Sequence, residues 1–387
     1  MSTIIRTRSP FFIRTPEVTG ATNISNLDHF RMDISVYDGN SGDFANSCSN
    51  VYAFFQLKKK PLPFETSVTF EISEIVNDQI IQTFDGTYDN SRTFQSVWVN
   101  VKTSARQSNG TLIGSVTSTI YLAQEGFNKF NEGVNYITEP ILMISNTYYE
   151  YHKGSSIRLP INKERVVSIA YKLNGSTIST QSFTDSGSQS QKIGYTNVTT
   201  TTQKYDELLV TYDTSLTTSY TLKEVEECKY PVQKITFLNR WGALQDLFFH
   251  KKSVNSLDTS RETFNRSIFK ARNVSKEFVT PEEGGSEVCV ETITFNTYST
   301  TAHAKKVHNA NGKESVVLNS GFVDERMNVY FEELMVSEYI WLTDDQNVIY
   351  PVCITDSSFT KKTSLNDRLI NYTMNFEKAF DFVNNIR

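Results

Sequence analysis

The chain has 387 residues, and its 38 Lys and Arg against 43 Asp and Glu give a formal net charge of -5. This length predicts about two to three domains, and the near balance of charge excludes the basic footprint of a protein that wraps nucleic acid. Aromatic residues make up 12% of the chain, which together with the small net charge excludes a disordered protein. The many Thr, Tyr and Phe residues favour strands, so we expect a mainly β fold.

Residues 1–126 predict an N-terminal β-sandwich of the immunoglobulin or fibronectin type. Residues 30–37 alternate apolar and polar side chains, as a strand with one wet face does. Asn109 and Gly110 lie between two alternating runs and predict a hairpin. A short helix fits only within residues 71–81. Further strands are expected at 51–57, 67–72, 95–105 and 111–122.

A joint and a second β-sandwich are predicted at residues 127–227. Residues 126–133 have no sustained period and form the predicted joint. Asn174 and Gly175 repeat the hairpin signature. The strands of this second sandwich are expected at 157–161, 166–172, 176–183, 208–212 and 220–225.

Residues 228–387 predict a third, β-barrel-like domain with one packed helix at about 324–337. Asp324 is a suitable N-cap for this helix. One apolar face of the helix is expected to contain Met327, Tyr330, Phe331, Leu334 and Met335. Residues 309–312 predict a turn between two strands. The strands are expected at 234–240, 244–249, 288–298, 315–318, 339–342, 348–354 and 370–377.

Targeting signals and reactive cysteines are not expected. No window approaches the ~18 apolar residues of a membrane span, and Arg6 and Arg8 interrupt the apolar content that a signal peptide needs. We therefore expect the protein to form in the cytoplasm of the cell that makes it. The cysteines are too widely spaced for a metal or redox motif, and free thiols are expected, with one buried pair as the alternative. They are Cys48, Cys228, Cys289 and Cys353.

Motifs that carry chemistry are weak in this sequence. Residues 38–43 resemble the start of a calcium loop, but Ser49 stands where such a loop needs an acidic ligand. His303 and His308 would lie on opposite faces of a strand. Glu332 and Glu333 are expected on the wet face of the predicted helix. We therefore predict no catalytic, cofactor or metal residues, and a protein that is not an enzyme.

Four segments resemble tail-region structural proteins of crAss-like phages, the tailed bacteriophages that infect Bacteroidetes. The resemblance implies a non-enzymatic virion protein of the tail hub or neck, a hexameric or dodecameric ring. Such a ring would contact other tail proteins, and genomic DNA would pass through its lumen without sequence-specific binding. The segments are residues 8–13, 125–133, 234–254 and 366–387.

Two further expectations concern the surface. Acidic clusters at residues 282–291 and 332–345 would suit a lumen that does not grip DNA. The alternative function is a receptor-binding or carbohydrate-binding tail fibre or adhesin, for which the tyrosines at 148, 149 and 151 would have to be exposed. Three tryptophans are expected in the core rather than at interfaces, namely Trp98, Trp241 and Trp341.

Overall fold

The computed structural model confirms a mainly β fold with one short packed helix in its C-terminal part. Its contacts divide the chain into two compact units, Met1–Val254 with Val316–Ala379, and Asn255–Ser315 with Phe380–Arg387. The three domain ranges expected from the sequence stay a prediction. The structure describes residues 4–38, 51–88, 96–135, 140–183, 193–227, 229–268, 270–279, 288–363 and 370–383.

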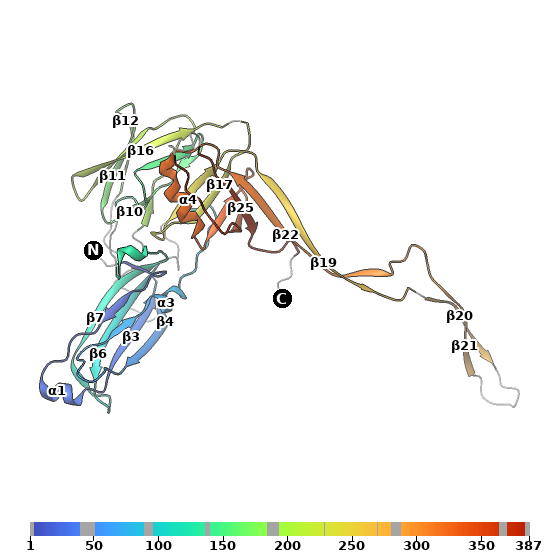
Figure 1. The fold of residues 1–387 in the computed structure, drawn as a ribbon, viewed down its shortest axis with the longest axis horizontal. Coiled ribbons are helices and arrows are strands. Elements are labelled where there is room, and N and C mark those ends of the chain that lie inside the picture. The colour runs from blue at the N-terminus through green and yellow to red at the C-terminus, as the bar shows by residue number, and fades with distance from the viewer. Residues whose placement is uncertain are drawn as a thin grey trace. The chain divides into compact units, whose positions relative to one another are not determined.

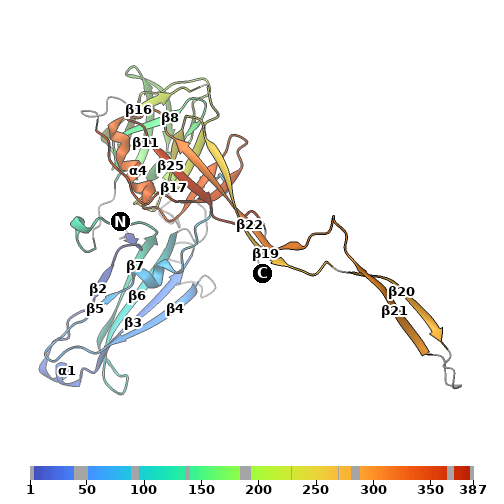
Figure 2. The same cartoon turned by 45° about the vertical axis from the view of Figure 1, so that its right-hand side comes forward.

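The first unit begins with a five-stranded sheet, whose strands lie side by side in Figure 2. β1 pairs in parallel with β7, and the other pairs are antiparallel. The predicted hairpin at Gly110 connects β6 to β7. β4 is an edge strand and ends at Lys58 and Lys59, charged residues that hinder pairing with another chain. In sheet order the strands are β1 (Ile4–Arg6), β7 (Leu112–Gln124), β6 (Ser96–Arg106), β3 (His29–Tyr37) and β4 (Val51–Lys59).

One face of this sheet forms its own core. The alternation in β3 buries Phe30, Met32 and Ile34, which share a cluster with Phe70 and Val76. These last two come from β5 (Thr69–Glu71), which pairs with β2 (Phe12–Arg14), and from the predicted short helix, α3 (Ser73–Asn77). A second helix, α1 (Ala21–Asn26), was not predicted, because all six residues are exposed and leave no amphipathic pattern.

The second sheet also has five strands. Asn174 and Gly175, with φ angles of 50° and 78°, form the predicted hairpin between β11 and β12. In sheet order the strands are β12 (Ser176–Ser182), β11 (Val166–Leu173), β15 (Glu207–Tyr212), β16 (Leu216–Val225) and β8 (Tyr148–His152). Two small sheets accompany it: β10 (Pro160–Asn162) with β13 (Ile193–Tyr195), and β9 (Ser156–Ile157) with β14 (Val198–Thr199).

The third sheet has seven strands and shares one hydrophobic core with the second. The core joins tyrosines of β8 to Phe249 and Phe376 of this sheet and to Tyr330 and Phe331 of the helix. The predicted helix is a 3-10 turn, η3 (Glu325–Met327), followed by α4 (Asn328–Met335). In sheet order the strands are β18 (Leu244–Phe249), β17 (Gln233–Leu238), β23 (Ile340–Thr343), β24 (Ile349–Ile354), β25 (Thr373–Lys378), β22 (Lys305–Asn319) and β19 (Val254–Asn265).

The second compact unit is a ribbon formed by residues 255–315 and the C-terminal segment. Figure 1 shows β19 and β22 continuing along the chain toward β20 (Lys270–Val279) and β21 (Val288–Thr297), which pair antiparallel with each other alone. Every residue of β19 is exposed. A strand at 288–298 was expected, but the sequence did not indicate the rest of the ribbon. Polar residues occupy both faces of β19, so it lacks the alternation of a half-buried strand.

The turn predicted at residues 309–312 is wrong, because these residues lie inside β22. Gly312 instead lets two other segments lie close to the backbone of β22. A Cβ at this position would lie 2.9 Å from Leu257 Cδ1 and 3.4 Å from Phe382 Cβ. The amide of Phe382 donates to the Gly312 carbonyl at 2.8 Å, and Asn311 donates to Asp381 at 2.6 Å. The Asn-Gly pair therefore makes room for the C-terminal segment within the ribbon.

Candidate functional site

The strap at residues 124–133, which contains the predicted joint, is fastened to the loop that follows β17. Gln124 Nε2 donates to the Trp241 carbonyl at 3.0 Å, and the Phe127 amide donates to the Arg240 carbonyl at 2.9 Å. Two glycines make this approach possible: a Cβ at Gly126 would lie 2.7 Å from Arg240 O, and one at Gly242 would lie 2.1 Å from Glu125 O. The strap, including the short helix η2 (Phe130–Glu132), is thus a fixed connection.

Two arginines stack on Trp241 within this connection. The guanidinium carbons of Arg6 and Arg240 lie 4.3 and 4.6 Å from the ring centroid. Arg240 also binds Glu132 through two hydrogen bonds of 2.5 and 2.7 Å, and Arg6 donates to Asn128. Burial raises the pKa of Glu132, but the hydrogen bonds and charge of Arg240 outweigh it and hold that pKa below its usual value. Arg8 also belongs to this junction, because its amide donates to the Gly126 carbonyl at 3.0 Å and its guanidinium pairs with Glu338.

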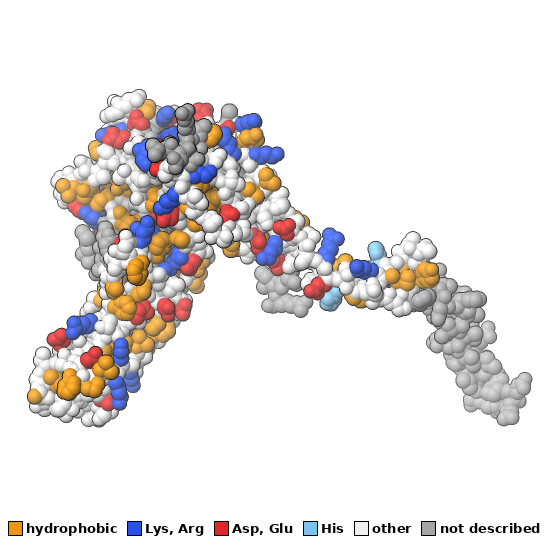
Figure 3. All heavy atoms as spheres, viewed as in Figure 1, with side chains coloured by type: hydrophobic (Ala, Val, Ile, Leu, Met, Phe, Trp, Pro, Cys, Tyr) orange, Lys and Arg blue, Asp and Glu red, His pale blue; other side chains and the backbone are white. Residues whose placement is uncertain are grey.

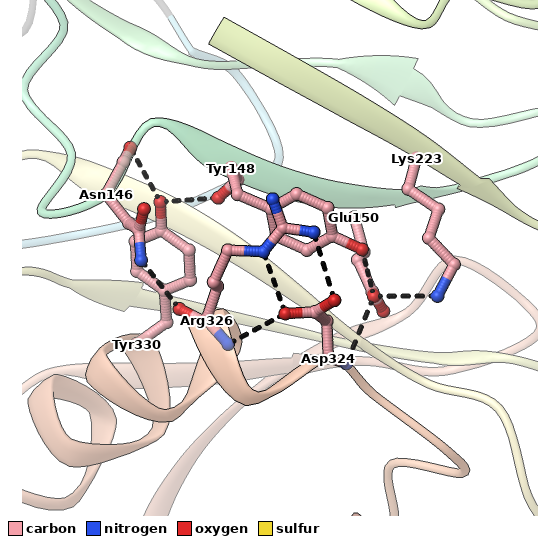
Figure 4. Close-up of polar contacts among 7 residues, drawn as sticks. All are labelled: Asn146, Tyr148, Glu150, Lys223, Asp324, Arg326 and Tyr330. Atoms are coloured by element: carbon pink, nitrogen blue, oxygen red, sulfur yellow. Dashed lines mark hydrogen bonds and ion pairs between the residues drawn. The ribbon is translucent and has the colours of Figure 1, made fainter. Parts of the chain in front are cut away.

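A second polar cluster fastens the helix to β8 (Figure 4). Asp324 accepts from the Arg326 amide at 3.0 Å, which confirms Asp324 as an N-cap. The Arg326 guanidinium lies 3.6 Å from the centroid of the Tyr148 ring and pairs with Asp324. Glu150 accepts from Tyr148 at 2.6 Å, from Lys223 at 3.1 Å and from the Asp324 amide at 3.2 Å. Since these charges satisfy one another, the cluster stabilises the shared core.

The tyrosines that the alternative fibre function would need on the surface are buried. Tyr148, Tyr149 and Tyr151 are 2%, 2% and 1% exposed. Different partners cover the three rings: Tyr149 packs edge-on against Tyr330 of the helix, the Arg326 guanidinium lies over the Tyr148 ring, and the Tyr151 hydroxyl donates to the Tyr205 carbonyl at 2.9 Å. The three tryptophans are likewise buried, as expected.

A cavity of about 430 Å³ lies between the loop before β6, the β8–β9 connection and the third sheet. Its best-defined group is Tyr88, whose hydroxyl donates to Asp246 at 2.5 Å and accepts from Lys234 at 3.2 Å. Thr236 donates to the same Asp246 oxygen at 2.6 Å. Burial and the Asp246 carboxylate raise the pKa of Tyr88 far above its usual value, so it stays a hydrogen-bond donor. The other lining side chains include His152, Arg158, Phe248, Asp344 and Asp345.

His152 in this cavity is arranged for packing. Its ring lies 6.2 Å from that of Phe248 and 5.5 Å from that of His250. Burial lowers the pKa of His152, and it lowers that of His250 to about 4. Both rings are therefore neutral at pH 7, and the cavity combines neutral rings, two cations and hydrogen-bonded carboxylates.

Removing the Tyr88 hydroxyl tests how much this network contributes to stability. We expect Tyr88→Phe to lower the free energy of unfolding by about 1–2 kcal/mol, because a buried carboxylate loses one of its donors. The control is Tyr212→Phe, whose hydroxyl accepts only one long bond of 3.5 Å from Thr218. Equal urea midpoints for Tyr88→Phe and the unsubstituted protein would contradict this account.

Several acidic residues of the helix region have polar partners within the chain. Glu333 is buried, so its predicted place on the wet face is wrong: Ser145 and the Arg240 amide cover that side of the helix and donate to its carboxylate. Glu332 pairs with Lys361 at 2.6 Å, while Asp344 accepts from two amides of its own turn. Figure 3 shows blue and red side chains interspersed on the visible face. Two of the acidic residues at 332–345, Glu332 and Glu338, thus form ion pairs with Lys361 and Arg8.

Within the described ranges, no group of three or more His, Cys, Asp and Glu side chains could hold a metal ion. A helix long enough to cross a membrane is also absent from these ranges, where the longest, α4, has 8 residues. Cys353 is a free, exposed thiol. The calcium-like residues at 39–43 and the acidic residues at 282–287 lie outside the described residues.

No protein-family model matches the chain, and no curated protein matches it.

Proposed function

We propose that the protein is a non-enzymatic structural subunit of a phage tail, which assembles as a hexameric or dodecameric ring in the hub or neck. The observation that carries this proposal is the ribbon. It is exposed along the whole of β19, and β20 and β21 form a two-stranded sheet with no third strand in the described residues. An isolated two-stranded sheet is marginally stable in water, so a ribbon of this kind is suited to contact with another subunit.

The exposed apolar side chains of the ribbon support the same proposal. These side chains remain accessible although the strands of the ribbon pair with one another. Their burial against a neighbouring subunit would stabilise the contact by ~25 cal/mol per Å² of apolar surface. A ring of identical subunits uses such a heterologous contact, which closes by rotation. The residues are Leu257, Phe264, Tyr298, Val307, Phe380 and Phe382.

The mixed charge is compatible with a DNA conduit. Glu332 and Glu338 have Lys361 and Arg8 as ion-pair partners, so neither sign dominates around the helix. We propose that DNA passes such a wall without being held. A particle reconstruction with a continuous Lys and Arg belt along the channel would contradict this part of the proposal. The fibre alternative gains no support from the buried tyrosines of β8.

The oligomeric state tests the ring. We expect mass photometry of the full chain to find six or twelve copies, and a variant with residues 267–302 replaced by Asn-Gly to be a folded monomer. The replacement keeps the bond from the Arg266 amide to the Ala304 carbonyl, 2.9 Å, at the base of the new hairpin. A full chain that stays monomeric or forms trimers would overturn the ring proposal.

A further inference from the structure

The edges of the three large sheets differ in how they are protected against pairing with another chain. Natural edges are short, charged, interrupted by proline or covered. β1 has three residues, β4 ends in lysines, and β8 and β18 are largely buried. β19 carries Asp258, Arg261 and Glu262. In the described part of the chain, β12 has none of these protections: its seven residues, Ser176–Ser182, include no charge and no proline, and most of them are exposed.

The register of β12 places part of its backbone toward the free edge. The Phe183 amide donates to the Val167 carbonyl at 2.8 Å, immediately beyond the paired residues. Hydrogen-bonded and non-bonded pairs alternate along an antiparallel ladder, so Gln181 and Ser179 bond to β11. The amide and carbonyl groups of Thr180 therefore point away from β11. In the described part of the chain, β11 is the only strand that pairs with β12.

The ribbon supplies a strand of matching character. The sequence of β20 contains four charged residues, whereas β21 has the sequence VCVETITFNT with Glu291 as its one charge. The Val, Ile, Thr and Phe residues of β21 favour a strand within a larger sheet. β21 has 10 residues and can cover all 7 residues of β12.

We propose that β12 receives β21 of a neighbouring copy by strand addition, which extends the second sheet across the subunit interface. This inference rests on the proposed ring. Main-chain hydrogen bonds at the β12 edge would supply affinity, as in other cases of strand addition. Because one subunit gives its ribbon and the next gives its edge, the contact is heterologous and repeats around a ring.

Substitutions at Thr180 test the edge without disturbing the ladder to β11. We expect Thr180→Pro to weaken subunit association about 10- to 100-fold, because an outward donor is lost and its partner carbonyl is left unpaired. Thr180→Val keeps the amide and should assemble as the unsubstituted chain does. Thr180→Lys keeps the amide and adds a charge that hinders pairing at a sheet edge, so it should also weaken association. This variant tests the edge even if Thr180→Pro fails to fold.

Mixing two defective variants identifies the partner strand. Thr180→Pro has an intact ribbon, and the chain with residues 267–302 replaced has an intact β12 edge. Each should be a monomer alone, while the equimolar mixture should form heterodimers in mass photometry. Homodimers of Thr180→Pro alone would overturn the inference in favour of ribbon-to-ribbon pairing. Normal rings from both Thr180→Pro and Thr180→Lys would overturn it while leaving the ring itself standing.

Discussion

Gly242→Ala is expected to lower the free energy of unfolding by at least about 4 kcal/mol. The added Cβ would lie 2.1 Å from Glu125 O and 2.9 Å from Glu125 C, both of them backbone atoms. Gly242 also has a φ of 75°, which an alanine adopts at a cost of about 1–2 kcal/mol. The strap at residues 124–133 must therefore move away, and its bonds to Arg240 and Trp241 are lost.

Gly114→Ala is the matched control for this prediction. Gly114 has nearly the same φ, 74°, but a Cβ there would meet nothing within 4 Å. Gly114→Ala should lower the free energy of unfolding by only about 1–2 kcal/mol, the cost of placing an alanine at a positive φ. Urea unfolding measures the loss of stability in each variant. The difference between the two losses is the cost of the steric clash at Gly242. Equal losses in the two variants would show that the strap is not held against Gly242.

Much of the local structure could be predicted from the sequence, because it depends on neighbouring residues. The hairpin at Asn174 and Gly175 follows from the positive φ angles that a tight turn requires. The helix after Asp324 follows from a cap and an apolar face of period 3.6. In the last strand the expected alternation buries Ile370, Tyr372, Met374 and Phe376. In each case the signal and the structure lie within about ten residues of each other.

What could not be predicted depends on contacts between distant segments. Gly312 has the sequence signature of a turn, but its environment is set by Leu257 and Phe382. The expected joint at residues 126–133 is a fixed strap, because Gly126 meets a loop more than 100 residues away. Glu333 lies beside the apolar stripe of its helix, and only the tertiary structure shows that Ser145 covers it. A periodic pattern describes one face of an element and not what covers its other faces.

Glu333→Gln is expected to stabilise the protein at pH 8 by about 1–3 kcal/mol. Burial raises the pKa of Glu333 from 4.5 to about 7, although the hydrogen bond from Ser145, the Arg240 amide and the Arg240 charge oppose it. The folded carboxyl therefore holds a proton that the unfolded chain releases near pH 4.5. The stabilisation from the neutral carboxyl is complete below that pH and is lost as the pH rises through 7. A pKa that differs by one between the folded and unfolded chain corresponds to about 1.4 kcal/mol, and a lost acceptor for Arg240 reduces the gain.

The neighbouring carboxylate is the control, because the same substitution there should act in the opposite direction. The hydrogen bond from Lys361 lowers the pKa of Glu332, so its contribution is present above the unfolded pKa and is lost as the pH falls. Because Glu332 is about a third exposed, Glu332→Gln should cost only about 0.5 kcal/mol at pH 8. Urea unfolding between pH 4.5 and 8 measures the pH dependence of stability in both variants. Titration of His250 contributes equally to the two profiles and does not affect their difference. A Glu333→Gln profile parallel to that of the unsubstituted protein would mean that folding does not raise the pKa of Glu333.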